Sequence, residues 1–236
     1  MKNTSQEILD ATQGQTFTVN GVSFLMKPVE GGTIQLGYDD GDITTGEKRV
    51  HEETVGSFYM GETLVTQALW KAVTGTTIEH CRDRVDRFYE LKGHGDDYPM
   101  YFVSWHDCQR FLTKLNELTG KTFRMPTEEE WEFAAHGGIK TNGYLYAGSN
   151  DLDEVAWYAG NSFEASHPVK TKHPNELGLY DMSGNVWEWC GRTDHDGLYH
   201  LHGGAWDCEP KYCRVSCRPY DESNIRYSNI GFRIVL

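Results

Sequence analysis

Side chains that could bind a soft metal ion gather near the C-terminal end of the sequence. Three histidines precede three of the six cysteines there: His195, His200, His202, Cys208, Cys213 and Cys217. Imidazole nitrogen and thiolate sulfur are ligands that zinc prefers in proteins. The spacing offers neither a His-x3-His pair nor a Cys-x2-Cys pair. Exposed loop histidines are therefore the favoured interpretation, and a zinc site is the alternative.

A carboxylate lies between two tryptophans in the run Gly-Asn-Val-Trp-Glu-Trp at 184–189. A carboxylate held among aromatic rings must be paired with a cation, hydrogen-bonded or bound to a metal. Two interpretations stay open for Glu188. It bonds a backbone N–H or an arginine, which we favour, or it binds a metal cation.

Several other functions are disfavoured by composition and by motifs that the sequence lacks. It has no nucleophilic serine motif and no glycine-rich phosphate loop. The net charge is −13, which argues against a nucleic-acid partner, because a phosphate backbone requires clustered Lys and Arg. The sequence contains no run of about 18 apolar residues, so no membrane span is predicted. The start of the sequence has no apolar signal segment, so the expected location is the cytoplasm.

The strands and helices that must position these histidine, cysteine and carboxylate side chains are predicted to be short. Residues 1–16 are polar and are interpreted as a leader, and residues 17–236 as a single domain. Apolar residues alternate from Phe17 onward, and Asn20-Gly21 predicts the turn of a β-hairpin. Residues 29–37 and 57–60 are predicted to form further strands.

Helical spacing predicts three helices in the middle of the chain. One covers 63–73, a second begins at Ser104 and ends before Gly120, and a third begins at Thr127. After residue 138 no helical period remains, and the glycine-rich sequence predicts long loops, short strands and a final strand at 230–236. The expected class is α+β, with reduced thiols, because six cysteines are too few for a disulfide scaffold.

Several segments, in order, resemble the sulfatase-modifying-factor family, which contains the formylglycine-generating enzymes and non-catalytic relatives. The matching segments are 26–32, 62–70, 103–105, 124–132, 178–189, 203–206 and 231–233. The resemblance implies a C-type-lectin-like fold that is rich in loops, with short antiparallel strands and two to three helices.

This family can hold Ca²⁺ in the loop that contains Glu188. The resemblance places the ligands at the side chains of Asp181 and Glu188 and the carbonyl groups of Met182, Gly184 and Val186. Hard oxygen ligands of this kind suit Ca²⁺. A structural calcium ion is thus the cofactor that the resemblance implies.

The catalytic members use a Cys-x4-Cys pair to bind Cu(I) and oxidise a substrate cysteine, and thiolates select Cu(I). Cys208 and Cys213 have this spacing. The stretch that follows, 214–218, is shorter than in catalytic members and resembles the non-catalytic branches, in which Cys213 would be a buried framework residue. A copper-dependent formylglycine-generating oxidase is therefore the alternative function.

The C-terminal pattern most resembles the variable proteins of diversity-generating retroelements, whose domain ends in a diversified segment closed by a Gly-Phe-Arg strand. The framework positions would be Gly203, Gly204, Trp206, Cys213, Arg214, Arg218, Arg226 and 230–233. The resemblance implies a non-catalytic ligand-binding protein with a variable segment at 204–231. The predicted ligand-binding residues are Asp207, Cys208, Glu209, Lys211, Tyr212, Cys217, Tyr220, Asp221, Ser223, Asn224, Ile225, Tyr227, Ser228 and Asn229.

The side chains at 207–229 have the chemistry of a binding surface. Tyr212, Tyr220 and Tyr227 offer rigid amphipathic area, and the Ser, Asn and Asp residues offer adaptable hydrogen bonds. The expected partner is a protein or another macromolecule, and a phage or virion component is an alternative to a cytoplasmic protein. An ordinary polar surface loop is the other interpretation of this segment.

Overall fold

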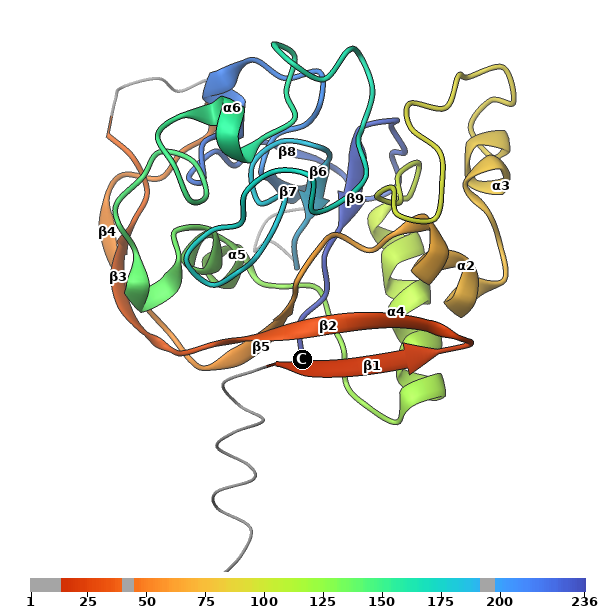
Figure 1. Cartoon of the computed structure of the whole chain (residues 1–236), viewed down its shortest axis with the longest axis horizontal. Helices are drawn as coiled ribbons and strands as arrows, with labels where there is room; N and C mark the ends of the chain where they lie inside the picture. Colours follow the sequence, from red (N-terminus) through yellow and green to blue (C-terminus); the bar gives the residue numbers. More distant parts are fainter. Residues whose placement is uncertain (1–13, 40–44, 192–197) are drawn as a thin grey trace, which may run out of the picture.

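The computed structural model describes residues 14–39, 45–191 and 198–236 (Figure 1). Residues 1–13 of the predicted polar leader lie outside this range. The first strand, β1 (Gln15–Val19), begins within the last residues assigned to that leader.

The predicted hairpin is confirmed. Strand β1 pairs antiparallel with β2 (Val22–Val29), with Phe17 opposite Phe24. Asn20 and Gly21 join the strands with positive φ angles of 48° and 84°, the geometry that Asn-Gly favours in a two-residue turn. Strand β5 (Phe58–Gly61) pairs with the other edge of β2. Figure 1 shows this sheet crossing one end of the molecule.

The described part of the chain forms two further sheets. Strands β3 (Gly32–Leu36) and β4 (His51–Val55) pair antiparallel as a separate ribbon. A four-stranded sheet has the order β8-β7-β6-β9, in which only β6 and β9 are parallel. Its strands are β6 (Trp187–Trp189), β7 (Leu198–His202), β8 (Tyr220–Glu222) and β9 (Ile230–Phe232). The final strand is therefore shorter than the predicted range 230–236.

The three predicted helices are present, and their ends follow the capping residues. Helix α2 (Gln67–Thr74) begins four residues later than predicted. Helix α4 (Trp105–Thr119) has Ser104 as a capping-box residue and ends at Gly120 in the left-handed conformation. Helix α5 (Glu128–Ala135) has the capping box of Thr127 with Glu130.

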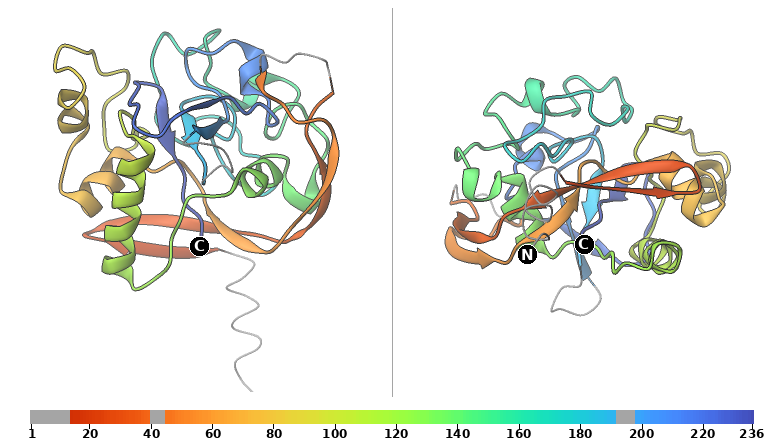
Figure 2. Two further views of the ribbon diagram at one scale, coloured as in Figure 1. Left: turned by 180° about the vertical axis from the view of Figure 1, so that it is seen from behind. Right: turned by 60° about the horizontal axis from the view of Figure 1, so that its bottom comes forward.

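The described residues also form four short helical segments that the sequence does not predict: α3 (Ile78–Asp83), η2 (Gly138–Lys140), α6 (Leu152–Val155) and η3 (Pro210–Cys213). Each has six residues or fewer, so none is long enough to show a hydrophobic period. Figures 1 and 2 show α2, α3 and α4 grouped on one side of the molecule, with β3 and β4 on the other.

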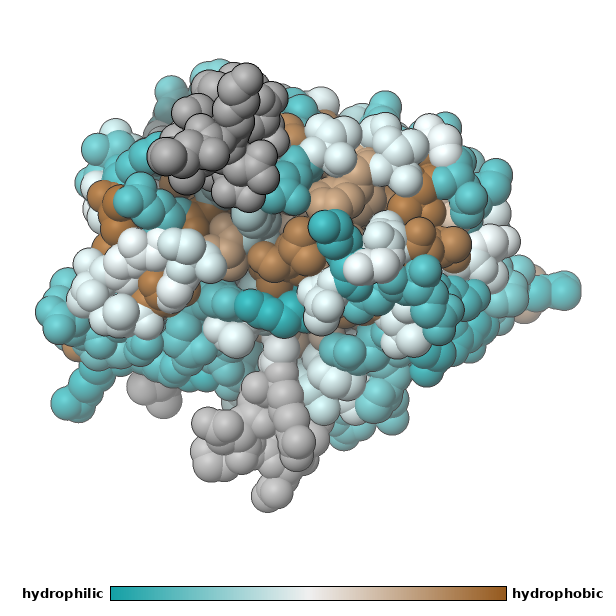
Figure 3. All heavy atoms as spheres, turned by 90° about the horizontal axis from the view of Figure 1, so that it is seen from below, coloured by the Kyte–Doolittle hydropathy of each residue, from teal (hydrophilic) through white to brown (hydrophobic). Residues whose placement is uncertain are grey.

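Aromatic rings join the helical side to the four-stranded sheet. Trp70 of α2 stacks on Phe111 of α4, with ring centroids 5.4 Å apart. The Phe111 ring meets Phe232 of β9 edge-on at 5.2 Å. Strand β9 is thereby held against both helices. Figure 3, which shows the end that carries the β1–β2 hairpin, has hydrophobic side chains interspersed among hydrophilic ones.

A buried ion pair lies at the centre of the fold. Neither Glu188 of β6 nor Arg233, which follows β9, is exposed to solvent. Arg233 donates to both carboxylate oxygens of Glu188, from Nη2 at 2.9 Å and from Nε at 3.0 Å. It also donates to the carbonyl oxygens of Gly61 and Tyr180. Trp131 Nε1 of α5 donates to Glu188 Oε2 at 2.9 Å. This one network joins β5, α5, β6 and the end of the chain.

Removing one member of this pair should destabilise the fold strongly. Arg233→Met leaves the Glu188 carboxylate buried without a cation, and such a loss costs about 3–5 kcal/mol. Urea denaturation measures the free energy of unfolding. The double variant Glu188→Gln/Arg233→Met should lose less free energy of unfolding than the two single variants lose together, because no unpaired charge remains. Simple additivity would contradict this interpretation.

Candidate ligand-binding surface

Residues 207–229, here called the tail segment, connect β7 to β9 and contain η3 and β8. In Figures 1 and 2 this blue stretch runs along the part of the molecule opposite the β1–β2 hairpin. Its two ends are tied together, because Asn229 Nδ2 donates to both carboxylate oxygens of Asp207 at 3.0 Å. The segment is thus a closed loop on the scaffold.

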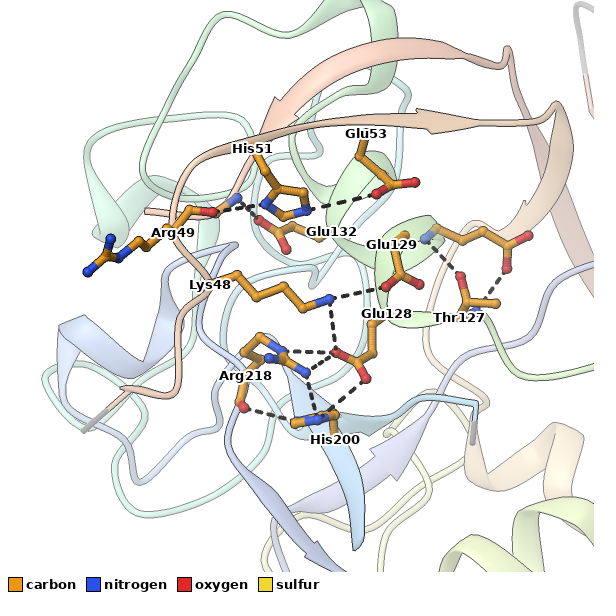
Figure 4. Close-up of polar contacts among 12 residues, drawn as sticks. Lys48, Arg49, His51, Glu53, Thr127, Glu128, Glu129, Glu132, His200 and Arg218 are labelled. Carbon is orange, nitrogen blue, oxygen red and sulfur yellow. Dashed lines mark hydrogen bonds and ion pairs between the residues drawn. The ribbon is translucent and has the colours of Figure 1, made fainter. Parts of the chain in front are cut away.

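Two arginines fix the middle of the tail segment to the scaffold. The Arg218 guanidinium donates to Oε2 of Glu128, the first residue of α5, from Nε at 2.9 Å and from Nη2 at 2.5 Å. Figure 4 shows Arg218 between Glu128 and His200, with Lys48 nearby. Arg214 lies 3.6 Å from Glu47. Both arginines are framework positions in the sequence-based prediction.

A third arginine fixes the far end of the segment. Arg226 Nε donates to Asp107 Oδ2 at 2.6 Å. Asp107 is 3% exposed, and burial alone would raise its pKa. Hydrogen bonds from Arg226, Arg84 and Ser104 outweigh this and hold the pKa of Asp107 well below its usual range. The anchor is therefore an ionised pair at neutral pH.

The cysteines are packing residues in this structure. Cys213 and Cys217 are not exposed at all, and Cys208 is partly buried against the same cluster as Cys213. Burial raises the pKa of Cys208 to about 12 and the pKa of Cys213 well above its ordinary value. The thiolate is the nucleophile and the metal ligand, so a reaction or a bound metal at either cysteine must first displace its proton.

One predicted ligand-binding residue must be corrected. Cys217 was expected at the surface, but it belongs to the main hydrophobic core. Its Sγ donates to the carbonyl oxygen of Thr45 at 3.5 Å. A small thiol packs as a hydrophobic residue at this position.

Most of the other predicted residues reach the solvent. The Tyr220 and Tyr227 side chains are 60% and 51% exposed. Asp207, Glu209 and Asn224 are also exposed. The remaining predicted residues are partly exposed: Cys208, Lys211, Tyr212, Asp221, Ser223, Ile225, Ser228 and Asn229. Exposed positions therefore alternate with the anchored arginines and the buried thiols.

The loop after α3 adds a wall that the sequence analysis missed. A pocket of about 330 Å³ lies between it and the tail segment, lined by Val85, Tyr89 and Phe102 on one side and by Tyr227 on the other. Tyr89 is 54% exposed, and the neighbouring Phe88 is 82% exposed. Two adjacent aromatic residues in a polar stretch were the available signal for this surface.

Glu188 makes the contact favoured by the sequence analysis, because both of its oxygens accept hydrogen bonds from Arg233. The guanidinium occupies both of the oxygen atoms that a calcium ion would need, so Glu188 acts as an ion-pair partner in this arrangement.

The second carboxylate of the predicted set is Asp181, which accepts from the Lys170 N–H and from Asn185 Nδ2. Burial raises the pKa of Asp181. Met182, Gly184 and Val186 are buried in the same loop. The calcium site stays a prediction.

The sequence favoured exposed loop histidines, and this interpretation is wrong for His200 and His202. His195 lies outside the described residues. His200 and His202 lie on β7, and His202 is not exposed at all. Its ring stacks on Trp131 with centroids 4.8 Å apart, and neither ring nitrogen has a hydrogen-bond partner. Within the described residues, no group of three or more His, Cys, Asp and Glu side chains could hold a metal ion.

Comparison with known proteins reveals similarity along nearly the whole chain. The family described as Sulfatase-modifying factor enzyme 1-like domain matches residues 20–236. The chaperone protein LppX of Paenibacillus barcinonensis is 31% identical over 257 residues, covering 88% of this chain and 87% of that protein. The formylglycine-generating enzyme of Mus musculus is 25% identical over 282 residues, covering 88% of this chain and 74% of that enzyme.

A solved structure resembles the fold just as fully. Treponema denticola variable protein 1 matches with a TM-score of 0.81 and 30% identity, covering 94% of this chain and 98% of that chain. The predicted family resemblance and the α+β, C-type-lectin-like fold class are confirmed. Within the part of the chain that the structure describes, no helix is long and apolar enough to span a membrane.

The buried His202 makes stability depend on pH. Burial, with Arg218 nearby, lowers the pKa of His202 well below its usual value, so the folded state keeps it neutral. The unfolded chain has a histidine pKa of about 6.5 and binds the proton first as the pH falls. Stability should therefore decrease below about pH 6.5, by at most about 1.4 kcal/mol per pH unit for this histidine.

Urea denaturation between pH 5 and pH 7.5 measures this dependence. His202→Phe keeps a ring against Trp131 and should flatten the profile. An equally steep profile in His202→Phe would rule out His202 as its source.

Substitutions in the tail segment should separate display positions from anchors. Tyr220→Ala and Tyr227→Ala remove exposed rings and should change the free energy of unfolding by less than about 0.5 kcal/mol. Arg218→Ala leaves the half-buried Glu128 without its closest cation, so it should lower the free energy of unfolding more than either tyrosine variant does. Thermal unfolding of the three variants compares them. A larger loss in Tyr220→Ala would mean that its ring belongs to the core.

Proposed function

Because the chain belongs to the Sulfatase-modifying factor enzyme 1-like domain family, we propose that it uses this scaffold to bind a macromolecular ligand through the tail segment, without catalysis. The observation that carries the proposal is the alternation along that segment. Arg214, Arg218 and Arg226 are ion-paired to the scaffold. The residues between them expose tyrosine, aspartate and asparagine side chains.

The chemistry of the exposed side chains supports a protein or another macromolecule as the ligand. Tyrosine rings give contact area at a small cost in conformational entropy, and Asn, Asp and Ser form hydrogen bonds that adapt to different partners. Tyr220 and Tyr227 are the most exposed aromatic residues of the tail segment. The pocket beside Tyr227, with its wall of Tyr89 and Val85, would receive an apolar side chain of the ligand.

Similarity to Treponema denticola variable protein 1 supports a finer proposal, in which a retroelement diversifies the tail segment. A segment can vary without loss of the fold only where side chains do not pack in the core. The exposed positions of the tail segment satisfy this condition. The three anchoring arginines and the buried Cys213 do not satisfy it, because the fold depends on their contacts.

Sequencing of many copies of the gene, with its neighbourhood, tests the diversification. Substitutions should concentrate at exposed positions such as Tyr220, Asn224 and Tyr227, and they should be absent from Arg218 and Cys213. The neighbourhood should contain a reverse transcriptase gene and a near-copy of the 3′ end that differs at adenines. Absence of both would remove the retroelement from the proposal, and ligand binding would then need separate support.

The alternative function is a copper-dependent oxidase, and similarity to a formylglycine-generating enzyme supports it. It requires Cys208 and Cys213 as thiolates, and burial raises the pKa of both, so Cu(I) would have to displace their protons on binding. Titration with Cu(I), followed by an assay on a sulfatase-type peptide, separates the two functions. Copper-dependent turnover that Cys208→Ser abolishes would overturn the non-catalytic proposal.

A further inference from the structure

Basic side chains face one another across a small pocket between α2, α3 and α4. Arg110 and Lys114 lie one turn apart on α4, and His80 and Arg84 lie one turn apart at α3. All four line a pocket of about 150 Å³. Arg110 and Lys114 carry like charges at a spacing that destabilises a helix, and Arg84 brings a third positive charge to the same space.

The acidic side chain that lines this pocket is already engaged. Asp107 accepts from the Arg84 guanidinium at 2.8 Å, from Arg226 at 2.6 Å and from Arg110. It also accepts from the backbone N–H and the hydroxyl of Ser104. Three guanidinium groups thus share one carboxylate. This local excess of positive charge stands out in a chain whose net charge is −13.

Donors remain available around the pocket. Arg84 uses Nη1 for Asp107 and Arg110 uses Nη2, so among the contacts of the described residues Nε and the second terminal nitrogen of each are free for another acceptor. The Lys114 ammonium group makes a long contact of 3.4 Å with the carbonyl oxygen of Thr74. Thr74 and Thr76 also line the space, but their hydroxyl groups are already hydrogen-bonded to each other and to Trp70. The pocket volume of about 150 Å³ is many times the roughly 10–15 Å³ that a single water molecule needs, so a small anion has room there.

We propose that this pocket binds a phosphate group, either as inorganic phosphate or as a phosphate monoester. Guanidinium groups match paired phosphate oxygens with two parallel hydrogen bonds, and an ammonium group adds a point charge. A dianion bound among Arg84, Arg110 and Lys114 relieves their mutual repulsion. The site does not depend on the ligand of the tail segment, although Arg226 binds the same carboxylate.

Calorimetric titration of the full chain with inorganic phosphate, in chloride buffer at constant ionic strength, tests the site. Binding should saturate at one site per chain. Lys114→Gln and Arg110→Gln should each weaken it at least tenfold. Lys121→Gln is the matched control, because it removes one positive charge beyond the end of the same helix and outside the pocket. An equal loss in this control would mean that the anion responds to overall charge, and would overturn the site.

A parallel titration with O-phosphoserine distinguishes the two sources of the group. Binding of phosphoserine as tight as that of phosphate assigns the pocket to monoesters, and binding of inorganic phosphate alone assigns it to the free anion. Saturable binding of neither probe overturns the proposal. Without phosphate, the melting temperature of Lys114→Gln should equal or exceed that of the unchanged protein, which shows that a loss of binding is not a loss of folding.

Discussion

The pairing of Glu188 with Arg233 is the constraint on which the binding surface depends. Neither side chain is exposed, and the guanidinium also holds the carbonyl groups of Gly61 and Tyr180. Strand β9 is thereby fixed beside β6 at the point where the tail segment ends. A long segment with little regular structure can keep one conformation only if both of its ends are fixed, because each ordered residue costs conformational entropy. The buried pair supplies one of these fixed ends.

Charge then organises the segment between its ends. Arg214, Arg218 and Arg226 reach three different parts of the scaffold: the loop before β4, the start of α5 and the first turn of α4. Each contact is partly or fully sheltered from water, which strengthens it relative to an ordinary surface pair. Between these arginines, Val215, Ser216 and Cys217 are buried, whereas exposed residues such as Tyr220 and Asn224 are free to carry other side chains. Stability and recognition are thus assigned to different residues of the same segment.

The sequence predicted the features that are decided within a few residues. Ser104 and Gly120 bound α4 because caps act locally, and Asn20-Gly21 forms the hairpin turn for the same reason. Framework positions such as Arg218 were predicted through the family resemblance, but their acidic partners were not. The burial of His202 and Cys217 was also not predicted, because it depends on α5 and on the stretch near Thr45, which are distant in sequence.

The burial of Cys213 and the closeness of Gly204 to it have a consequence at the level of the genetic code. A side chain on Gly204 would lie 2.7 Å from the Cys213 sulfur, so Gly204 cannot carry one while the buried cysteine stays in place. Codons for glycine, cysteine and tryptophan contain no adenine at the bases that specify the amino acid, whereas codons for tyrosine, asparagine and aspartate have adenine in the middle. A mutator directed at adenines would therefore spare the packed residues of this segment and reach those that face the solvent. Packing and nucleotide chemistry would then protect the same positions.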